Sequence, residues 1–245
     1  MNRFLGAASI VVLTVCGSVR GDEQAAKVIL DKAIMALGGE ERLSKIKAFT
    51  VKGKGTVVIE GNDIPFTFET TANGIEQYRL TYEGETGGEK FAGATVIDGG
   101  KGWRKLDDDI QKLEGESLDN EKRSAYLEVV PILLTILKGE RFKLDLAAEE
   151  KASTGLKATG PDGKDFTIRF DKESGLPISL SGKVVDVEGK EFTQDTTLED
   201  YREFEGIKVA TKSRSKKDGE RYVEVDGMEF KVLDKVEPDT FAEPN

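Results

Sequence analysis

The sequence predicts a mainly β protein of the α+β class, built on one curled antiparallel sheet of about eleven strands. Three observations predict it. From residue 47 onward, apolar residues recur with a period of two, which is typical of strands that bury one face. Turns containing glycine separate these segments at short intervals. Helical spacing is confined to the N-terminus and one mid-chain segment, so most consecutive strands are expected to pair as neighbours.

Residues 1–21 have the order of a secretory signal peptide. A positive start at Arg3 precedes an apolar stretch over residues 4–15, and small residues precede Asp22. The apolar stretch is about 12 residues long, shorter than the roughly 20 that span a membrane. We expect cleavage after Gly21, which would leave residues 22–245 as a single domain exported to the periplasm. A buried N-terminal helix is the alternative.

A lipid anchor at Cys16 is a second alternative for this segment. Leu13 stands three residues before Cys16, as in a lipid-attachment box, but Val15 is larger than the residue usual there. Cleavage is therefore favoured over acylation. Loss of Arg3 and Arg20 would leave 34 basic and 46 acidic residues, a net charge of 34 − 46 = −12, and no cysteine.

Composition excludes several function classes. The full chain has 46 acidic and 36 basic residues, which disfavours the polyanionic nucleic acids and lipid surfaces as partners. It has no histidine, which excludes Ser-His-Asp and Cys-His catalytic groups and His-ligated metals. The acidic residues 107–109 lack the spacing of an EF-hand loop. We expect no cofactor, no metal, no nucleic acid partner and no catalysis.

The predicted elements follow in chain order. Residues 22–37 have apolar spacings of three and four, which predict an amphipathic helix that ends at Gly38. A short helical turn follows over residues 40–46. In the mid-chain segment, residues 118–138, Pro131 is expected to divide two helical pieces, the second of them apolar nearly all round. The segment 84–88 is expected to be a loop.

The remaining segments alternate as strands do. They lie near residues 47–51, 57–59, 64–68, 78–82, 95–97, 103, 142–146, 166–170, 176–180, 184–187, 191–197, 201–204, 207–213 and 222–232. Because neighbouring strands twist against each other, a sheet of this size curls and must fill its concave side. The helices are expected to cross the opening, and incomplete filling would leave an apolar pocket.

This order of elements resembles the periplasmic lipoprotein carrier and receptor proteins of the LolA/LolB-like superfamily. The sequence segments that carry the resemblance are residues 36–47, 96–103, 170–177, 200–207 and 238–244. The resemblance implies a half-open antiparallel β-barrel with a mid-chain helical lid. It also implies a monomer that holds lipid or lipoprotein acyl chains without chemistry, with envelope proteins as further partners. No basic residue is matched to the family's ligand-gating position.

The candidate cavity-lining residues are the large side chains of one sheet face and the apolar mid-chain segment. They are Phe66, Phe68, Tyr78, Leu80, Tyr82, Trp103, Val129, Leu133, Leu134, Leu137, Phe166, Ile168 and Phe170. For Trp103 and the aromatic residues, ordinary packing is the favoured alternative. The segment 129–137 fits a movable lid and a fixed core helix equally well.

Two other function classes stay open. A structural or interaction module of the cell envelope would have a filled core and an exposed apolar patch. A hydrolase with two carboxylates would need an acidic pair in a cleft, and 46 acidic residues offer no basis for choosing one.

Overall fold

Residues 18–245 are described by a computed structural model, in which they form one antiparallel sheet of thirteen strands. The strands, in chain order, are β1 Ala48–Ile59, β2 Asn62–Asn73, β3 Gln77–Thr86, β4 Glu89–Asp98, β5 Lys101–Leu106, β6 Asp109–Leu113, β7 Lys143–Leu146, β8 Ser153–Thr159, β9 Asp165–Asp171, β10 Pro177–Val185, β11 Glu191–Phe204, β12 Ile207–Lys217 and β13 Glu220–Leu233. The expected mainly β, antiparallel class is confirmed.

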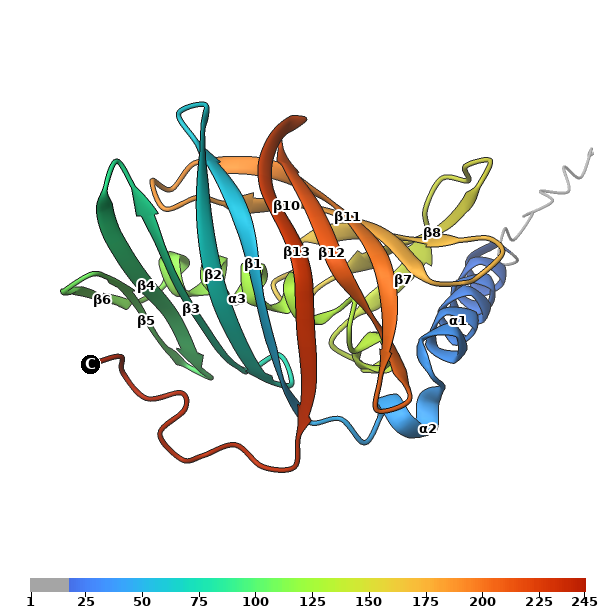
Figure 1. Ribbon diagram of the computed structural model, residues 1–245. Helices are drawn as coiled ribbons and strands as arrows, with labels where there is room; N and C mark the ends of the chain where they lie inside the picture. The colour runs from blue at the N-terminus through green and yellow to red at the C-terminus, as the bar shows by residue number, and fades with distance from the viewer. Residues whose placement is uncertain (1–17) are drawn as a thin grey trace, which may run out of the picture.

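The sheet consists of two meanders joined along one seam. Strands β1 to β6 pair in sequence order, as do β7 to β13, and β1 pairs antiparallel with β13. The two edges, β6 and β7, do not pair with each other, so the sheet is curved but not closed. Figure 1 shows the strands wrapping around α3, which lies inside the curve.

Helices occupy the two segments in which the sequence predicts them. They are α1 Ser18–Leu37, α2 Glu40–Leu43 and α3 Glu116–Val129, followed by the 3-10 helix η1 Leu134–Lys138. Helix α1 packs against β7 and β8 at the far end of the sheet. It begins at Ser18 rather than at residue 22. The predicted signal peptide otherwise lies outside the described residues, as does Cys16.

The predicted total of about eleven strands is lower than the thirteen observed, although the alternating segments number fourteen because some strands were divided. Strand β6 was missed because it is mostly exposed and polar, and β8 because its Ser-Thr-Gly segment lacks large side chains. Strands β1, β10 and β11 were each divided into two segments, although all three are continuous. In β11 the interruption corresponds to Asp200, whose φ of 54° makes a local irregularity in the pairing with β12. The segment predicted as a loop is the end of β3, and its turn is Gly87-Gly88.

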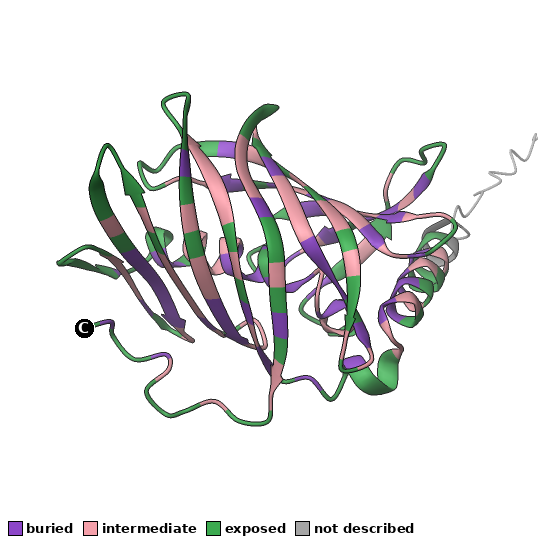
Figure 2. Cartoon of the chain, viewed as in Figure 1, coloured by how far each residue is buried: buried purple, intermediate pink, exposed green. Residues whose placement is uncertain are grey.

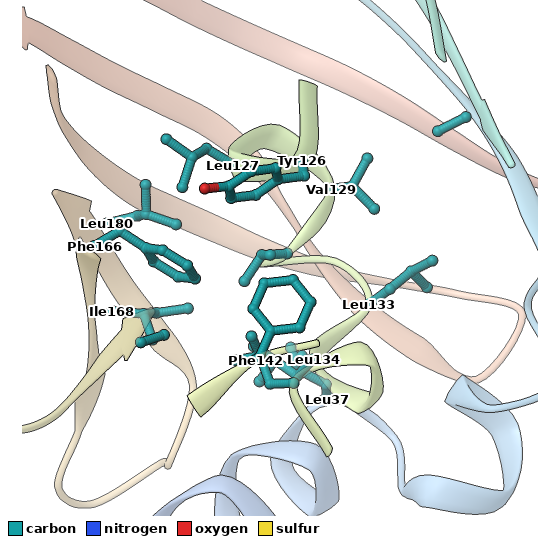
Figure 3. Packing of buried hydrophobic residues seen from close by; sticks show 14 of the residues in the cluster. Leu37, Tyr126, Leu127, Val129, Leu133, Leu134, Phe142, Phe166, Ile168 and Leu180 are labelled. Atoms are coloured by element: carbon teal, nitrogen blue, oxygen red, sulfur yellow. The ribbon is translucent and has the colours of Figure 1, made fainter. Parts of the chain in front are cut away.

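The mid-chain prediction needs a partial correction. The helical region divides at Pro131 as expected, but the second piece is only the short η1, which begins at Leu134. Its apolar residues Leu134 and Leu137 are 0% and 2% exposed. They lie in a large buried cluster with side chains from α1, α3, β9 and β10 (Figure 3). Along the strands, buried and exposed residues alternate as expected for a sheet with different faces (Figure 2).

Candidate functional site

The concave face of the first meander is identified by its contacts with α3. The Tyr78 hydroxyl donates a hydrogen bond of 2.5 Å to Oε2 of Glu128 on α3. On β5, a β-carbon at Gly102 would lie 2.6 Å from Leu118 of α3. Because side chains alternate along a strand, Leu80 and Tyr82 share the concave face with Tyr78. The register adds Phe68, which stands opposite Tyr82.

Four aromatic rings on this face lie over glycines of neighbouring strands. A β-carbon at Gly53 would come within 2.8 Å of the Phe68 ring, and one at Gly93 within 2.3 Å of the Tyr82 ring. The same relation joins Phe66 with Gly55 and Phe91 with Gly84. A side chain at any of these glycines would lift the ring off the sheet. We call these four rings, Phe66, Phe68, Tyr82 and Phe91, the aromatic floor.

The aromatic floor is accessible, unlike the core beside it. All four of its residues are half-buried. Leu106, on the same face of β5 beside Gly93, is 53% exposed. Deeper along the same face, Phe49 and Ile97 are each 1% exposed. The first meander therefore has a closed apolar end and an open aromatic end.

The substitution Gly53→Ala tests the contact beneath Phe68. The added methyl group has only side chains near it, namely Phe68 and Met228, so the ring must move while the backbone stays. Overpacking costs about 1 to 3 kcal/mol, and the lower conformational freedom of alanine offsets part of it. We expect a net loss of about 1 kcal/mol in chemical denaturation.

Gly100→Ala is the matched control for this prediction. Gly100 lies in the turn between β4 and β5, with no atom within 4 Å of an added β-carbon. This variant is expected to change stability by less than about 0.5 kcal/mol. Equal stability of the two variants would show that the ring does not rest on Gly53.

The Tyr78–Glu128 pair connects α3 to the front of the sheet. Tyr78 is 4% exposed, and burial together with the Glu128 charge raises the pKa of its hydroxyl well above the usual value. The phenol therefore stays protonated and donates. Burial raises the pKa of Glu128, while the hydrogen bond from Tyr78 opposes that shift. About two turns earlier on α3, Glu121 forms an ion pair with Arg104 of β5.

A buried arginine fixes α3 to the other wall. Arg123 is 1% exposed, and its Nη1 lies 2.9 Å from Oδ2 of Asp162 and 2.5 Å from the Tyr126 hydroxyl. Its remaining donors reach the backbone carbonyls of Lys183 and Asp165, the latter at 2.7 Å. All parts of the guanidinium thus have acceptors. Helix α3 is held on both sides within the curve of the sheet.

The structure separates the predicted cavity residues into three groups. Phe66, Phe68, Leu80 and Tyr82 are half-buried on the concave face, and Tyr78 lies deeper on that face. The second group is packed into the core at 2% exposure or less: Val129, Leu133, Leu134, Leu137, Phe166, Ile168 and Phe170. Trp103 pairs with Val96 and directly follows Gly102, which lies on the concave face. Because adjacent residues of a strand face opposite sides, Trp103 belongs to the convex face.

Sequence reasoning missed Glu128, Phe91 and the glycines beneath the rings. Isolated glycines inside a strand pattern mark places where another group approaches closely, so Gly53 and Gly55 carried a usable signal. Glu128 carried none, because nothing in its local sequence distinguishes it from the other acidic residues.

A second hollow lies on the convex face, where the C-terminal residues cross the sheet. Arg79 donates to the carbonyl of Thr240 at 3.3 Å, and Lys105 donates to the backbone oxygen of Asn245. The groove beside this segment measures about 570 Å³ and includes charged side chains of both signs, among them Glu69 and Glu83. Phe68 and Tyr82 also belong to the residues that line this groove, which therefore combines charged and apolar surface.

The residues that the structure describes hold neither a metal-binding cluster nor a membrane-spanning helix. Within residues 18–245, no group of three or more His, Cys, Asp or Glu side chains is arranged to hold a metal ion. None of the helices that the structure describes is long and apolar enough to cross a membrane.

Solved structures share this architecture. A DUF1329 family protein from Desulfovibrio piger superposes with a TM-score of 0.55 at 12% identity, covering 88% of this chain and 96% of that one. A LolA superfamily protein from Nitrosomonas europaea gives 0.54 at 12% identity, with coverages of 89% and 97%. An outer membrane lipoprotein-sorting protein domain from Vibrio parahaemolyticus gives 0.52 at 10% identity, with coverages of 87% and 97%.

These similarities establish the fold. The chain has the curved antiparallel sheet found in LolA superfamily, DUF1329 and lipoprotein-sorting domains, which confirms the resemblance expected from its layout. No protein-family model matches the sequence. No curated protein matches it in sequence either.

Proposed function

We propose that this is an exported, non-catalytic binding protein that holds acyl chains of a lipid or lipoprotein against its concave face. One observation carries the proposal: four half-buried aromatic rings lie over glycines of neighbouring strands and present an accessible apolar surface on the concave face. The fold supports it, since the same architecture occurs in a lipoprotein-sorting domain. Residues 22–245 would act as one monomeric, LolA-like periplasmic domain after loss of the leader, and no cofactor is involved.

The aromatic floor suits hydrocarbon for a physical reason. Burying apolar surface stabilises a complex by about 0.8 kcal/mol per methylene group, without requiring directional contacts. The glycines leave space over the strands that these rings occupy, and aromatic surfaces pack against alkyl chains. Helix α3, fixed by Arg123, provides the opposite wall. Transport or sorting would then need only binding and release.

Dodecanol, a neutral single chain, tests this function by displacement of the fluorescent probe N-phenyl-1-naphthylamine. Phe68→Gln removes one ring of the floor, and we expect it to weaken dodecanol binding about tenfold, or about 1.4 kcal/mol. Thr67→Gln is the matched control, because Thr67 is the adjacent residue of β2 and faces the opposite side. It should leave affinity unchanged. Saturable binding that both variants retain would place the ligand elsewhere.

A structural or interaction module of the envelope is the second candidate. The observation that favours it is the dense core of α1, η1 and the second meander, in which Leu134, Leu156 and Ile168 are each 0% exposed. Exposed Val28 and Met35 on α1, at 60% and 69%, add apolar surface outside that core. This candidate predicts that the wild-type protein binds neither the probe nor dodecanol.

A further inference from the structure

Glu128 is a carboxylate on the concave side that has no cationic partner. Its Oε2 accepts the 2.5 Å hydrogen bond from Tyr78. Among the residues that the structure describes, no lysine or arginine nitrogen lies within 4.0 Å of this carboxylate, whereas Glu121 on the same helix is paired with Arg104. Among the described residues, the Glu128 carboxylate thus accepts a hydrogen bond from a neutral phenol and has no ion-pair partner.

Glu128 as a residue keeps exposed surface although its neighbours are closed, while its carboxylate is desolvated where it meets Tyr78. Its neighbours on α3, Leu127 and Val129, are 5% and 2% exposed, while Glu128 itself keeps exposed surface. Helix α3 lies inside the curve of the sheet (Figure 1), and Tyr78 fixes the side toward which Glu128 points. Glu128 is thus presented to the space that the aromatic floor borders. Tyr78 and Tyr82 are four residues apart on one strand, roughly 13 Å along the floor.

Aromatic rings elsewhere on the concave face already hold a positive charge. The Lys217 ammonium lies 4.6 Å from the centroid of Phe192 and 6.0 Å from that of Tyr222. Ring faces attract cations through their quadrupole. An exposed ring surface combined with an unpaired carboxylate is the arrangement that recognises an ammonium group attached to an apolar chain.

We propose that the concave site selects amphiphiles with a positively charged, ammonium-type head group, which Glu128 binds while the chain lies on the aromatic floor. This rests on the proposed function, since it specifies the ligand of that same surface. An anionic head group would meet the uncompensated carboxylate. Arg104, on the same face of β5 as the floor, is already paired with Glu121 and offers it no free charge.

The test compares dodecylamine, dodecanol and dodecanoate, which share one chain length and differ in head-group charge. Each displaces N-phenyl-1-naphthylamine from the purified protein at about pH 8, because burial raises the pKa of Glu128 and a higher pH favours its ionised form. We expect dodecylamine to bind about tenfold more tightly than dodecanol, and dodecanoate to bind most weakly.

Variants assign this preference to one residue. Glu128→Gln keeps an acceptor for Tyr78 and should bring dodecylamine and dodecanol to equal affinity. Glu128→Lys should reverse the order in favour of dodecanoate. Glu116→Gln, on an exposed residue in the first turn of α3, makes the same change in net charge and should preserve the wild-type preference.

The outcomes separate this inference from the function on which it rests. Equal affinities for all three ligands in the wild-type protein, or a preference that persists in Glu128→Gln, would overturn the ammonium assignment while leaving chain binding intact. Failure of the probe and of every ligand to bind the folded protein would overturn both.

Discussion

Replacing Arg123 with methionine is expected to lower the free energy of unfolding by about 3 kcal/mol, because it removes a buried charge and leaves its hydrogen-bond partners unpaired. The guanidinium is 1% exposed and bonds Asp162, Tyr126 and two backbone carbonyls. Methionine keeps the apolar stem but leaves those acceptors without donors. Asp162 is 18% exposed at its side chain, and this partial hydration places the effect at the lower end of the range for broken buried pairs.

The control for this prediction is Arg141→Met. Arg141 also pairs with a carboxylate, that of Glu76, but their side chains are 55% and 49% exposed. Exposed pairs of this kind contribute about 0 to 1 kcal/mol. Chemical denaturation of both variants measures the difference. If Arg123→Met costs no more than Arg141→Met, α3 is not held by the buried network.

Leu133→Glu is expected to unfold the protein or to lower its stability by at least about 4 kcal/mol. The side chain is 2% exposed and belongs to the central apolar cluster (Figure 3), so an ionised carboxylate there would lose its hydration without gaining a partner. Circular dichroism and thermal melting detect the loss. The same substitution at a ligand-facing position of an open cavity would leave the fold intact.

Met35→Glu is the matched control for Leu133→Glu. Met35 is 69% exposed on α1, where a glutamate remains hydrated and compatible with the helix. This variant should melt within a few degrees of the wild type. A folded Leu133→Glu variant would mean that the segment after α3 can leave the core, as a movable lid would.

Much of the fold follows from the sequence because its signals are local. Alternation of large residues predicted most strands, and Pro131 predicted the end of α3. The pairing of β1 with β13 joins segments far apart in the chain, and no local pattern specifies it. The prediction missed strands whose pattern is weak. The exposed, polar β6, for example, has almost no buried face to produce alternation.

The candidate site was predictable only in part. Phe68 and Tyr82 could be placed on one face from their alternation, but the same reasoning could not show that both rings lie over glycines of adjacent strands. Trp103 was grouped with them by residue type, whereas strand phase assigns it to the convex face. Phe166 and Ile168 share the alternation of the floor residues, yet α3 and η1 cover them completely. Periodicity identifies a face; tertiary packing decides whether that face is open.

Arg123 and the aromatic floor have complementary roles in the proposed function. The buried network holds α3 against the second meander, while Tyr78 and Arg104 connect it to the first. The helix thereby divides the concave side into a filled core and an accessible surface. A ligand would bind to the accessible part without disturbing the packing that stabilises the protein.

The most direct test of this function is the crystal structure of the protein with a dodecanol analogue brominated along its chain, located by anomalous scattering of bromine. We expect the bromine peak on the concave face, in contact with Phe68 or Tyr82 and beside α3. A peak on the convex face, beside the Arg79 and Lys105 side chains and away from the Phe68 and Tyr82 rings, or no ordered bromine at saturating ligand, would contradict acyl-chain binding on the aromatic floor.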